Sequence, residues 1–302
     1  MQKRIFTIGD NAPVARDTFR LVLRTDGPVD VRSGQFVDIA VPGFFLRRPI
    51  SVSDCLPDGL VLYYKVVGEG TRALSAMRPG ASLELLCGLP GDAKAASAAA
   101  TECQQDAKHR SNEVADRNEV QVAFPLHRGM SHQRQGVWEG DGILGLGQGF
   151  HPEKCHEAAL LIGGGLGAAP LYLLAKELLA QGKTATAVLG FNRADEICLA
   201  EEMRALGIPV HIATMDGSVG TKGFVTDAVA ATRPVFDRFY TCGPLPMMKV
   251  VCTALDTPGE VSLEERMGCG AGFCYGCSIQ TQNGPRRVCA DGPVFDKEEV
   301  LW

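Results

Sequence analysis

The stretch AALLIGGGLGAAPLYLLAKELLAQG, residues 158–182, is the clearest indication of the fold of the larger domain. It begins as a short apolar run typical of a buried strand, turns through glycines, and continues as an apolar-periodic helix that Gly182 closes. The turn contains Gly163, Gly164, Gly165 and Gly167. Glycines there let the backbone approach a dinucleotide pyrophosphate, whose charge the helix N-terminus favours. Because the spacing is not the usual G-x-G-x-x-G, a tight turn that only packs helix against sheet is the alternative.

Strands and helices continue to alternate after this stretch. The expected strands are ATAVLGF (185–191), PVHIATMDG (209–217) and RFYTCGP (238–244), and the expected helices are ADEICLAEEMRALG (194–207) and FVTDAVAATR (224–233). Alternation of this kind is typical of a doubly wound parallel sheet with helices on both faces. We therefore predict an α/β nucleotide-binding domain over residues 142–262.

The first ninety residues follow a different pattern. Short β-rich runs, separated by Pro, Gly and Asp, are RIFTIGD (4–10), FRLVLRT (19–25), QFVDIAV (35–41), ISVSD (50–54) and LVLYYKVVG (60–68). This pattern is typical of a small antiparallel barrel or sandwich, and we predict a barrel over residues 1–91. The helical signal in this region is TRALSAM (71–77), with Thr71 as the expected cap.

Residues 92–141 interrupt the pattern. They begin with alanine-rich, polar sequence that has no clear apolar face, and EVQVAFPL (119–126) is the part with a strand-like pattern. Such a composition buries too little apolar surface to offset the entropy of ordering. We predict a polar, flexible insertion on the surface.

The bulk properties exclude several classes of protein. The chain of 302 residues is 45% apolar, enough for two or three domains, but no apolar run approaches the length of a membrane span. The start, MQKRIFTIGDNAPVARD, lacks the apolar segment of a signal peptide, so we expect a cytoplasmic protein. The net charge is −5 with both signs interspersed, which disfavours nucleic-acid binding.

Four of the eleven cysteines lie in one stretch, GCGAGFCYGCSIQTQNGPRRVC (268–289). They are Cys269, Cys274, Cys277 and Cys289, and their spacing, C-x4-C-x2-C-x11-C, is the plant-type spacing for a [2Fe–2S] cluster. Thiolates suit this role because iron with bridging sulfide prefers soft anionic ligands. The alternative is a structural zinc site, but its cysteines usually come in two close pairs, whereas Cys289 stands alone. We predict a [2Fe–2S] domain over residues 263–302.

Two further motifs lie in the predicted barrel. In Arg47-Arg48-Pro49-Ile50-Ser51-Val52, a guanidinium is suited to a pyrophosphate and a serine to the edge of a flavin; an exposed basic strand is the alternative. In Tyr63-Tyr64-Lys65, followed by Gly70-Thr71, an aromatic pair is expected to flank a flavin ring, with Gly-Thr at a phosphate. Tyrosines of the core are the alternative there.

Taken in order, RRPISV, YYKVVGEGT, GGGLGAAP, TCGP and ERMGCGAGFCYGC…C resemble the electron-transfer subunits of the NAD-dependent (class 1B) dihydroorotate dehydrogenases, in the ferredoxin–NADP reductase superfamily. The resemblance covers roughly residues 1–90 and 142–302. The superfamily usually has tyrosine where this chain has Ile50, a change that looks like the dihydroorotate group. A segment usually found directly after the barrel is split here between LLCGLPG (85–91) and GLGQGF (145–150).

The resemblance implies a set of cofactor contacts. FAD is expected at Arg48, Pro49, Ile50, Ser51, Tyr63, Tyr64, Lys65, Gly70 and Thr71. The nicotinamide nucleotide is expected along Gly163, Gly164, Gly165 and Gly167 and at Cys242, Gly243 and Pro244. The [2Fe–2S] cluster is expected on the four C-terminal cysteines.

The resemblance also implies an electron path. Dihydroorotate reduces FMN on a separate catalytic subunit, and electrons then pass through the [2Fe–2S] cluster and FAD of this chain to NAD⁺. FAD lies between the other two because NAD exchanges two electrons at once, the cluster exchanges one, and a flavin can do both. The expected assembly is a heterotetramer with two copies of each subunit. No catalytic residue is predicted on this chain, because the cofactors carry the reaction.

Two alternatives to this function stay open. One is a related flavin reductase, either the small subunit of an NADH-dependent ferredoxin:NADP⁺ oxidoreductase or a sulfhydrogenase-type diaphorase subunit. The other is a non-catalytic nucleotide or redox sensor with a four-cysteine zinc site. The residues also leave NAD and NADP open, since Arg193 would favour a 2′-phosphate and Asp195 would repel one. The resemblance favours NAD.

Overall fold

The computed structural model describes residues 2–27, 29–87 and 145–302. The predicted insertion, residues 92–141 with its strand-like segment 119–126, lies outside the described residues.

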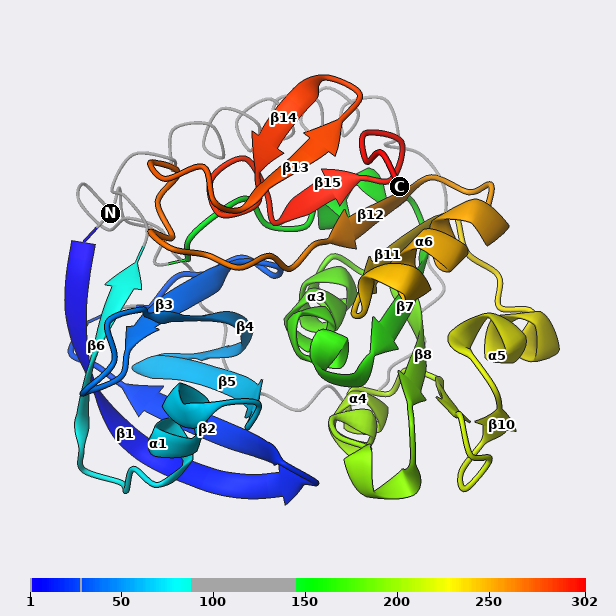
Figure 1. Cartoon of the computed structure of the whole chain (residues 1–302). Helices are drawn as coiled ribbons and strands as arrows, with labels where there is room; N and C mark the ends of the chain where they lie inside the picture. Colours follow the sequence, from blue (N-terminus) through cyan, green and yellow to red (C-terminus); the bar gives the residue numbers. More distant parts are fainter. Residues whose placement is uncertain (1, 28, 88–144) are drawn as a thin grey trace, which may run out of the picture. The chain divides into compact units, whose positions relative to one another are not determined.

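The N-terminal residues form a closed antiparallel barrel with the strand order β1-β2-β5-β4-β3-β6 (Figure 1). The strands are β1 (Gln2–Ala15), β2 (Thr18–Arg24), β3 (Phe36–Ala40), β4 (Arg48–Leu56), β5 (Gly59–Lys65) and β6 (Ser82–Cys87). Alternate residues such as Leu21, Leu23, Leu60 and Leu62 fill the barrel core, because successive strand side chains point to opposite faces. The barrel predicted from the sequence is confirmed, but β6, which closes it, was not predicted.

A short helix, α1 (Glu69–Ser75), follows β5. Thr71 caps the start of this helix, as predicted, but it does so from the third position of the helix, because α1 begins two residues earlier at Glu69. From inside the first turn, Thr71 Oγ1 accepts hydrogen bonds from the backbone N–H groups of Val67 (3.0 Å) and Gly68 (3.2 Å). The hydroxyl therefore fixes the loop that joins β5 to the helix.

The second sheet has the strand order β10-β9-β8-β7-β11-β12-β15. Its strands are β7 (Ala158–Gly164), β8 (Thr184–Phe191), β9 (Val210–Thr214), β10 (Thr221–Lys222), β11 (Arg238–Cys242), β12 (Gly259–Ser262) and β15 (Val294–Asp296). All neighbouring pairs are parallel except β12 and β15, so the doubly wound sheet is confirmed. The order reverses between β7 and β11, the point where ligands usually bind in such sheets.

Helices connect the parallel strands (Figure 1). They are α3 (Ala168–Ala180), α4 (Ala200–Ala205), α5 (Val225–Thr232) and α6 (Leu245–Ala254), with short 3₁₀ turns η1 (Pro152–Lys154), η2 (Gly165–Gly167) and η3 (Ala194–Glu196). The helix predicted over 194–207 is shorter, because Leu199 adopts a left-handed conformation with φ of 63° between η3 and α4. Within the described ranges, no helix has the length and apolar character needed to cross a lipid bilayer.

The cysteine-rich segment contains a small hairpin of β13 (Ser278–Thr281) and β14 (Gly284–Arg287) and then returns to the second sheet as β15. Cys277, Val288 and Cys289 pack in one apolar cluster with Phe36 of the barrel and Val261 of β12. The four-cysteine segment is therefore packed against residues of both sheets.

One carboxylate holds the start of β7, the strand that leads into the glycine turn. Asp237 accepts hydrogen bonds from the backbone N–H groups of His156 (2.9 Å), Glu157 (2.7 Å) and Ala158 (2.8 Å). Burial alone would raise the pKa of Asp237, but these donors outweigh it and lower the pKa to about 2. The charged form of Asp237 is therefore the one that stabilises this strand.

We expect Asp237→Ala to lower the free energy of unfolding by about 2 kcal/mol at neutral pH, since hydrogen bonds to a charged group are lost. Because the pKa in the folded state lies below the unfolded value of about 4, this stabilisation is present above pH 4 and is lost as the pH falls towards 2. Urea unfolding of the variant and the wild type at pH 7 and pH 2.5 measures the loss of stability and its dependence on pH. The exposed Asp256→Ala is the control, and an equal loss at the two pH values would contradict the assignment.

Candidate cofactor sites

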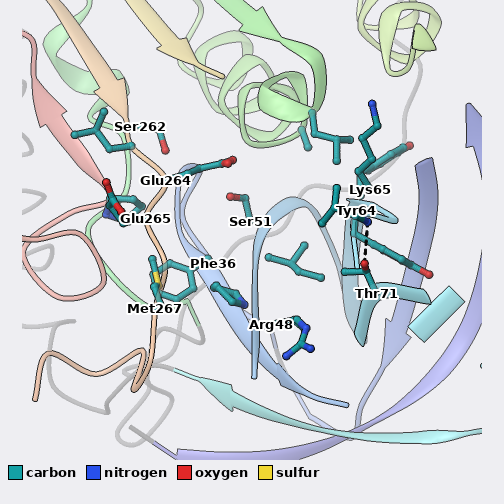
Figure 2. A pocket seen from close by; sticks show the side chains of 18 residues that line it. Phe36, Arg48, Ser51, Tyr64, Lys65, Thr71, Ser262, Glu264, Glu265 and Met267 are labelled. Carbon is teal, nitrogen blue, oxygen red and sulfur yellow. Dashed lines mark hydrogen bonds between the residues drawn. The ribbon is translucent and has the colours of Figure 1, made fainter. Parts of the chain in front are cut away.

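A cavity of about 350 Å³ lies beside β4 and β5 (Figure 2). Of the residues predicted to contact a flavin, those that line it are Arg48, Pro49, Ile50, Ser51, Tyr63, Tyr64, Lys65 and Thr71. Gly70 does not line the cavity, but it has a steric role, because a Cβ atom there would overlap the guanidinium of Arg48. The two barrel motifs, distant in sequence, are thus brought to one cavity.

Arg48 carries a positive charge at this cavity. Its guanidinium lies 5.1 Å from the centre of the Phe44 ring and donates hydrogen bonds to the carbonyl groups of Leu46 and Arg47. Among the described residues, no carboxylate lies within 4.0 Å of it, whereas the adjacent Arg47 pairs with Glu84. An uncompensated guanidinium in a cavity suits an anion such as the pyrophosphate of FAD.

Tyr63 and Tyr64 do not form a pair that encloses one ring. As successive residues of β5 they point to opposite faces, and Tyr63 packs in the apolar cluster of the second sheet while Tyr64 packs in the barrel. Tyr64 stacks on Phe19 with ring centres 5.6 Å apart and donates a hydrogen bond to Asn11 (2.9 Å). The expectation that both rings flank a flavin is therefore corrected by strand geometry, although both residues border the cavity.

The opposite wall of this cavity was not predicted from the sequence. It is formed by residues from after β7 and from the end of β12 onwards: Leu166, Ala169, Ser262, Leu263, Glu264, Glu265 and Met267. Figure 2 shows the side chains of Glu264 and Ser51 directed towards one another across the cavity. The surrounding protein raises the pKa of Glu264 through desolvation, although its side chain is open to the cavity. The sequence could have indicated Glu264, because it lies just beyond the end of a parallel strand, at the edge of the sheet where ligands usually bind.

A second cavity, of about 690 Å³, lies at the carboxyl ends of the parallel strands. Gly164, Gly165, Gly167, Gly243 and Pro244, all predicted to border the nicotinamide nucleotide, line it. The predicted residues Gly163 and Cys242 do not line it but support the turn. Cys242 is 1% exposed, and its carbonyl group would overlap a Cβ atom placed at Gly167.

The two cavities share part of their lining. Lys65, Leu166 and Glu264 border both of them. A flat ring in the first cavity and a nicotinamide in the second would therefore be neighbours. This arrangement fits direct hydride exchange, which requires the reacting atoms to be close.

The four predicted cluster cysteines come together as two pairs. The backbone N–H of Cys274 donates to the sulfur of Cys269, and the backbone N–H of Cys289 donates to the sulfur of Cys277. Backbone N–H groups donate to their sulfur atoms: Ala271 and Cys274 to Cys269 (3.4 and 3.5 Å), Gly276 to Cys274 (3.4 Å), Cys289 to Cys277 (3.4 Å) and Gly272 to Cys289 (3.2 Å). Such donors stabilise thiolates and the charge of a cluster.

The environments of the cysteines differ. Burial disfavours the thiolate of Cys269, but the N–H groups of Ala271 and Cys274 outweigh it and lower its pKa to about 7. Burial and the neighbouring Cys277 raise the pKa of Cys289 to about 12. In the described part of the chain, no three His, Cys, Asp or Glu side chains are arranged to hold a single metal ion. Four thiols that receive several N–H donors would suit a [2Fe–2S] cluster, because its iron prefers soft anionic ligands.

Comparison with known proteins identifies two families in this chain. Residues 264–301 match the family described as the iron-sulfur cluster binding domain of dihydroorotate dehydrogenase B, and residues 161–253 match the oxidoreductase NAD-binding domain. Among solved structures, that of an NADH-dependent reduced ferredoxin-NADP oxidoreductase has a TM-score of 0.72 and 26% identity, covering 98% of this chain and 90% of that chain. A ferredoxin NADP⁺ reductase from Neisseria gonorrhoeae, with a TM-score of 0.56 and 13% identity over 82% of this chain and 88% of its own, shares the fold.

Relatives that align with nearly the whole chain have a higher sequence identity than these two solved structures. Proteins from Fusobacterium nucleatum and Shouchella clausii, both named dihydroorotate dehydrogenase B (NAD(+)), electron transfer subunit, are each 34% identical to this chain. The alignments cover 97% and 98% of this chain and 96% of each relative. The iron–sulfur family match contains the four cysteines, and the NAD-binding match contains the glycine turn. This oxidoreductase chain therefore belongs to the family of electron transfer subunits of dihydroorotate dehydrogenase B (NAD(+)).

Proposed function

We propose that this protein passes electrons from an FMN-containing dihydroorotate dehydrogenase catalytic subunit to NAD⁺. Cys269, Cys274, Cys277 and Cys289 would hold a [2Fe–2S] cluster, and the cavity beside β4 and β5 would hold FAD. These groups would supply the one-electron and two-electron chemistry between the partner subunit and the nucleotide. One observation carries this proposal. The cavity assigned to FAD shares Lys65, Leu166 and Glu264 with the nucleotide cavity, and its wall at Met267 lies two residues before the first cluster cysteine.

The chain contributes binding and orientation. Arg48 offers a charge for the pyrophosphate of FAD, and the backbone around Gly164, Gly165 and Gly167 admits the nucleotide phosphates next to the start of α3. Bound flavin supplies the exchange between one-electron and two-electron carriers. Leu166, which borders both cavities, provides an apolar contact where the two rings would meet and helps to exclude water there.

The catalytic subunit is proposed to dock at the cluster loop. Cys274 is the exposed member of the four cysteines, and it lies between Phe273, which is 77% exposed, and Tyr275, which is 64% exposed. The guanidinium of Arg287 stands 5.2 Å from the centre of the Tyr275 ring. Exposed aromatic residues beside a redox centre are typical of a protein interface, where water exclusion aids electron transfer. The stoichiometry, two copies of each subunit, is part of the same proposal.

The test is reconstitution with the catalytic subunit encoded in the same genome. We expect the two chains to co-purify as a coloured complex that contains flavin and iron and reduces NAD⁺ with dihydroorotate. Without this chain, the catalytic subunit should not reduce NAD⁺. A colourless chain with one bound zinc would refute the electron path and support a sensor.

A second candidate is favoured by the solved structure of the NADH-dependent reduced ferredoxin-NADP oxidoreductase, which covers 98% of this chain. In that case this chain would exchange electrons with a ferredoxin-linked partner. A complex that reduces NADP⁺ with electrons from NADH and reduced ferredoxin, and does not oxidise dihydroorotate, would support this second function.

We expect Arg48→Ala to weaken FAD binding roughly tenfold or more, because a charge-assisted hydrogen bond contributes about 1.5–3 kcal/mol. Flavin fluorescence during titration of the apoprotein measures the dissociation constant. Arg78→Ala, at an exposed arginine outside the cavity, is the matched control. Equal affinity in the two variants would show that Arg48 is a surface charge.

The choice between NAD and NADP is expected to depend on the residues around Arg193. Its Nε atom lies 3.8 Å from Asp195 and 4.0 Å from Asp216, beside Asn192 and Met215 of the nucleotide cavity. Two carboxylates thus oppose a 2′-phosphate where one guanidinium would favour it.

We therefore expect Asp216→Asn to raise kcat/KM for NADPH relative to NADH about tenfold in a dye-reduction assay, because one repulsive charge is removed. Glu201→Gln, which changes a carboxylate paired with Arg204 outside the cavity, should leave the ratio unchanged. If both variants keep the wild-type ratio, Asp216 does not set the selectivity.

A further inference from the structure

A buried acid in the barrel has no assigned role. Asp38 of β3 is 2% exposed, and its Oδ1 atom accepts no hydrogen bond from the described residues. It is the one carboxylate with a buried, unpartnered oxygen in the described part of the chain. Burial of a charge without a partner is unfavourable, so such a group calls for an explanation.

The direction of Asp38 follows from strand alternation. Val37 and Ile39 point into the barrel core, so Phe36 and Asp38 share the outer face of β3. On that face Phe36 packs in one apolar cluster with Cys277 and Cys289. Asp38 therefore lies on the face of the barrel that is covered by the cysteine-rich segment.

Asp38 also touches the loop that carries the first cysteines. Gly270, which directly follows Cys269, has a φ of +63°, and a Cβ atom added to it would lie 2.7 Å from Asp38 Oδ2. The carboxylate is thus packed against the backbone of this loop. A side chain at position 270 would displace it.

The charge of Asp38 is only partly compensated. Burial raises its pKa to about 6, while the charges of Arg47 and Arg48 act in the opposite direction. Arg47 pairs with Glu84 and donates to the backbone carbonyl of Asp38 (3.3 Å), and Arg48 faces the flavin cavity. Among the described residues, no cation lies within ion-pair distance of the Asp38 carboxylate. A negative charge therefore remains beside the cluster loop in mildly alkaline solution.

We propose that Asp38 sets the reduction potential of the [2Fe–2S] cluster, keeping it low through its charge beside the Gly270 loop. An electron added to the cluster places negative charge near a fixed negative charge, which is unfavourable in a buried site. A lower potential favours onward transfer to the flavin over retention of the electron. The inference rests on the proposed cluster assignment, and Asp38 acts through the cluster without touching a substrate.

The experiment is a potentiometric titration of the holoprotein at pH 8, followed by the EPR signal of the reduced cluster. We expect Asp38→Asn to raise the midpoint potential, so that the ratio of reduced to oxidised cluster at a fixed ambient potential increases about tenfold. Asp38→Glu keeps the charge and should stay near the wild-type potential. Glu84→Gln removes a nearby carboxylate that pairs with Arg47 but does not touch Gly270, and it should not raise the potential.

Equal midpoint potentials in Asp38→Asn and the wild type, with the cluster retained, would overturn the inference. Equal upward shifts in Asp38→Asn and Asp38→Glu would also overturn it, because packing would then be the cause. If Asp38→Asn fails to hold a cluster, the smaller neutral variant Asp38→Ser is titrated in its place. A wild-type protein without a reducible [2Fe–2S] signal would instead refute the cluster assignment itself.

Discussion

Cys274→Ser is expected to abolish NAD⁺ reduction that depends on the catalytic subunit, together with the visible absorbance of the cluster. A serine oxygen is a harder and poorer ligand for iron than a thiolate, and Cys274 forms one of the two thiol pairs. Reduction of a small dye by NADH should survive, because a dye can take electrons from the flavin directly. Absorption spectra and the two assays, run on the same preparation, measure these effects.

The matched control is Cys252→Ser, at a half-buried cysteine outside the cluster segment. It should keep both activities and the cluster. If Cys274→Ser loses both activities while FAD stays bound, the proposed order of cofactors is wrong, since the flavin would then depend on the cluster even for dye reduction.

Gly167→Ala is expected to destabilise the protein by about 3 kcal/mol and to remove NAD binding. A Cβ atom at this position would overlap the carbonyl group of Cys242 and lie 2.7 Å from the backbone nitrogen of Gly243. Backbone atoms cannot move aside as a flexible side chain can. The glycine turn after β7 and the loop after β11 would therefore separate, and both line the nucleotide cavity.

Gly165→Ala is the control for Gly167→Ala, because it changes the same turn where no atom lies within 4 Å of the added Cβ. We expect Gly165→Ala to lower the free energy of unfolding by about 1–2 kcal/mol, because alanine is unfavourable in the left-handed conformation, with φ of +55°, at this position. Thermal unfolding monitored by circular dichroism compares the two variants. If Gly165→Ala is the more destabilising, backbone conformation outweighs the close approach of the two loops.

Much of the fold could be predicted because it depends on local patterns. The alternation around residues 158–182 predicted the doubly wound sheet, and the spacing of Cys269, Cys274 and Cys277 predicted an iron–sulfur domain; the structure and the family comparisons confirm both. NAD as a cofactor and membership of the dihydroorotate dehydrogenase B family are confirmed as well. The proposed domain limits and the individual cofactor contacts stay predictions.

The features of the fold and of the cavities that could not be predicted depend on contacts between residues far apart in the sequence. Nothing local in Val294–Asp296 indicates that it adds an antiparallel strand to a parallel sheet. Glu264 becomes a shared wall of two cavities only when the end of β12 meets β5 and the glycine turn. The opposite orientations of Tyr63 and Tyr64, in contrast, follow from the period of a strand and were available from the sequence.

The pairing of β15 with β12 has a consequence for how electrons travel. Asp296 at the end of β15 forms ion pairs with Arg238 (2.7 Å) and Lys154 (3.1 Å), and the buried Glu260 beside it accepts from His151. The segment that carries the cysteines is thereby fastened at its far end to the nucleotide sheet. A cluster held by these cysteines would therefore keep a fixed distance from a flavin bound beside β4 and β5, and electron transfer between the two would need no movement of a domain.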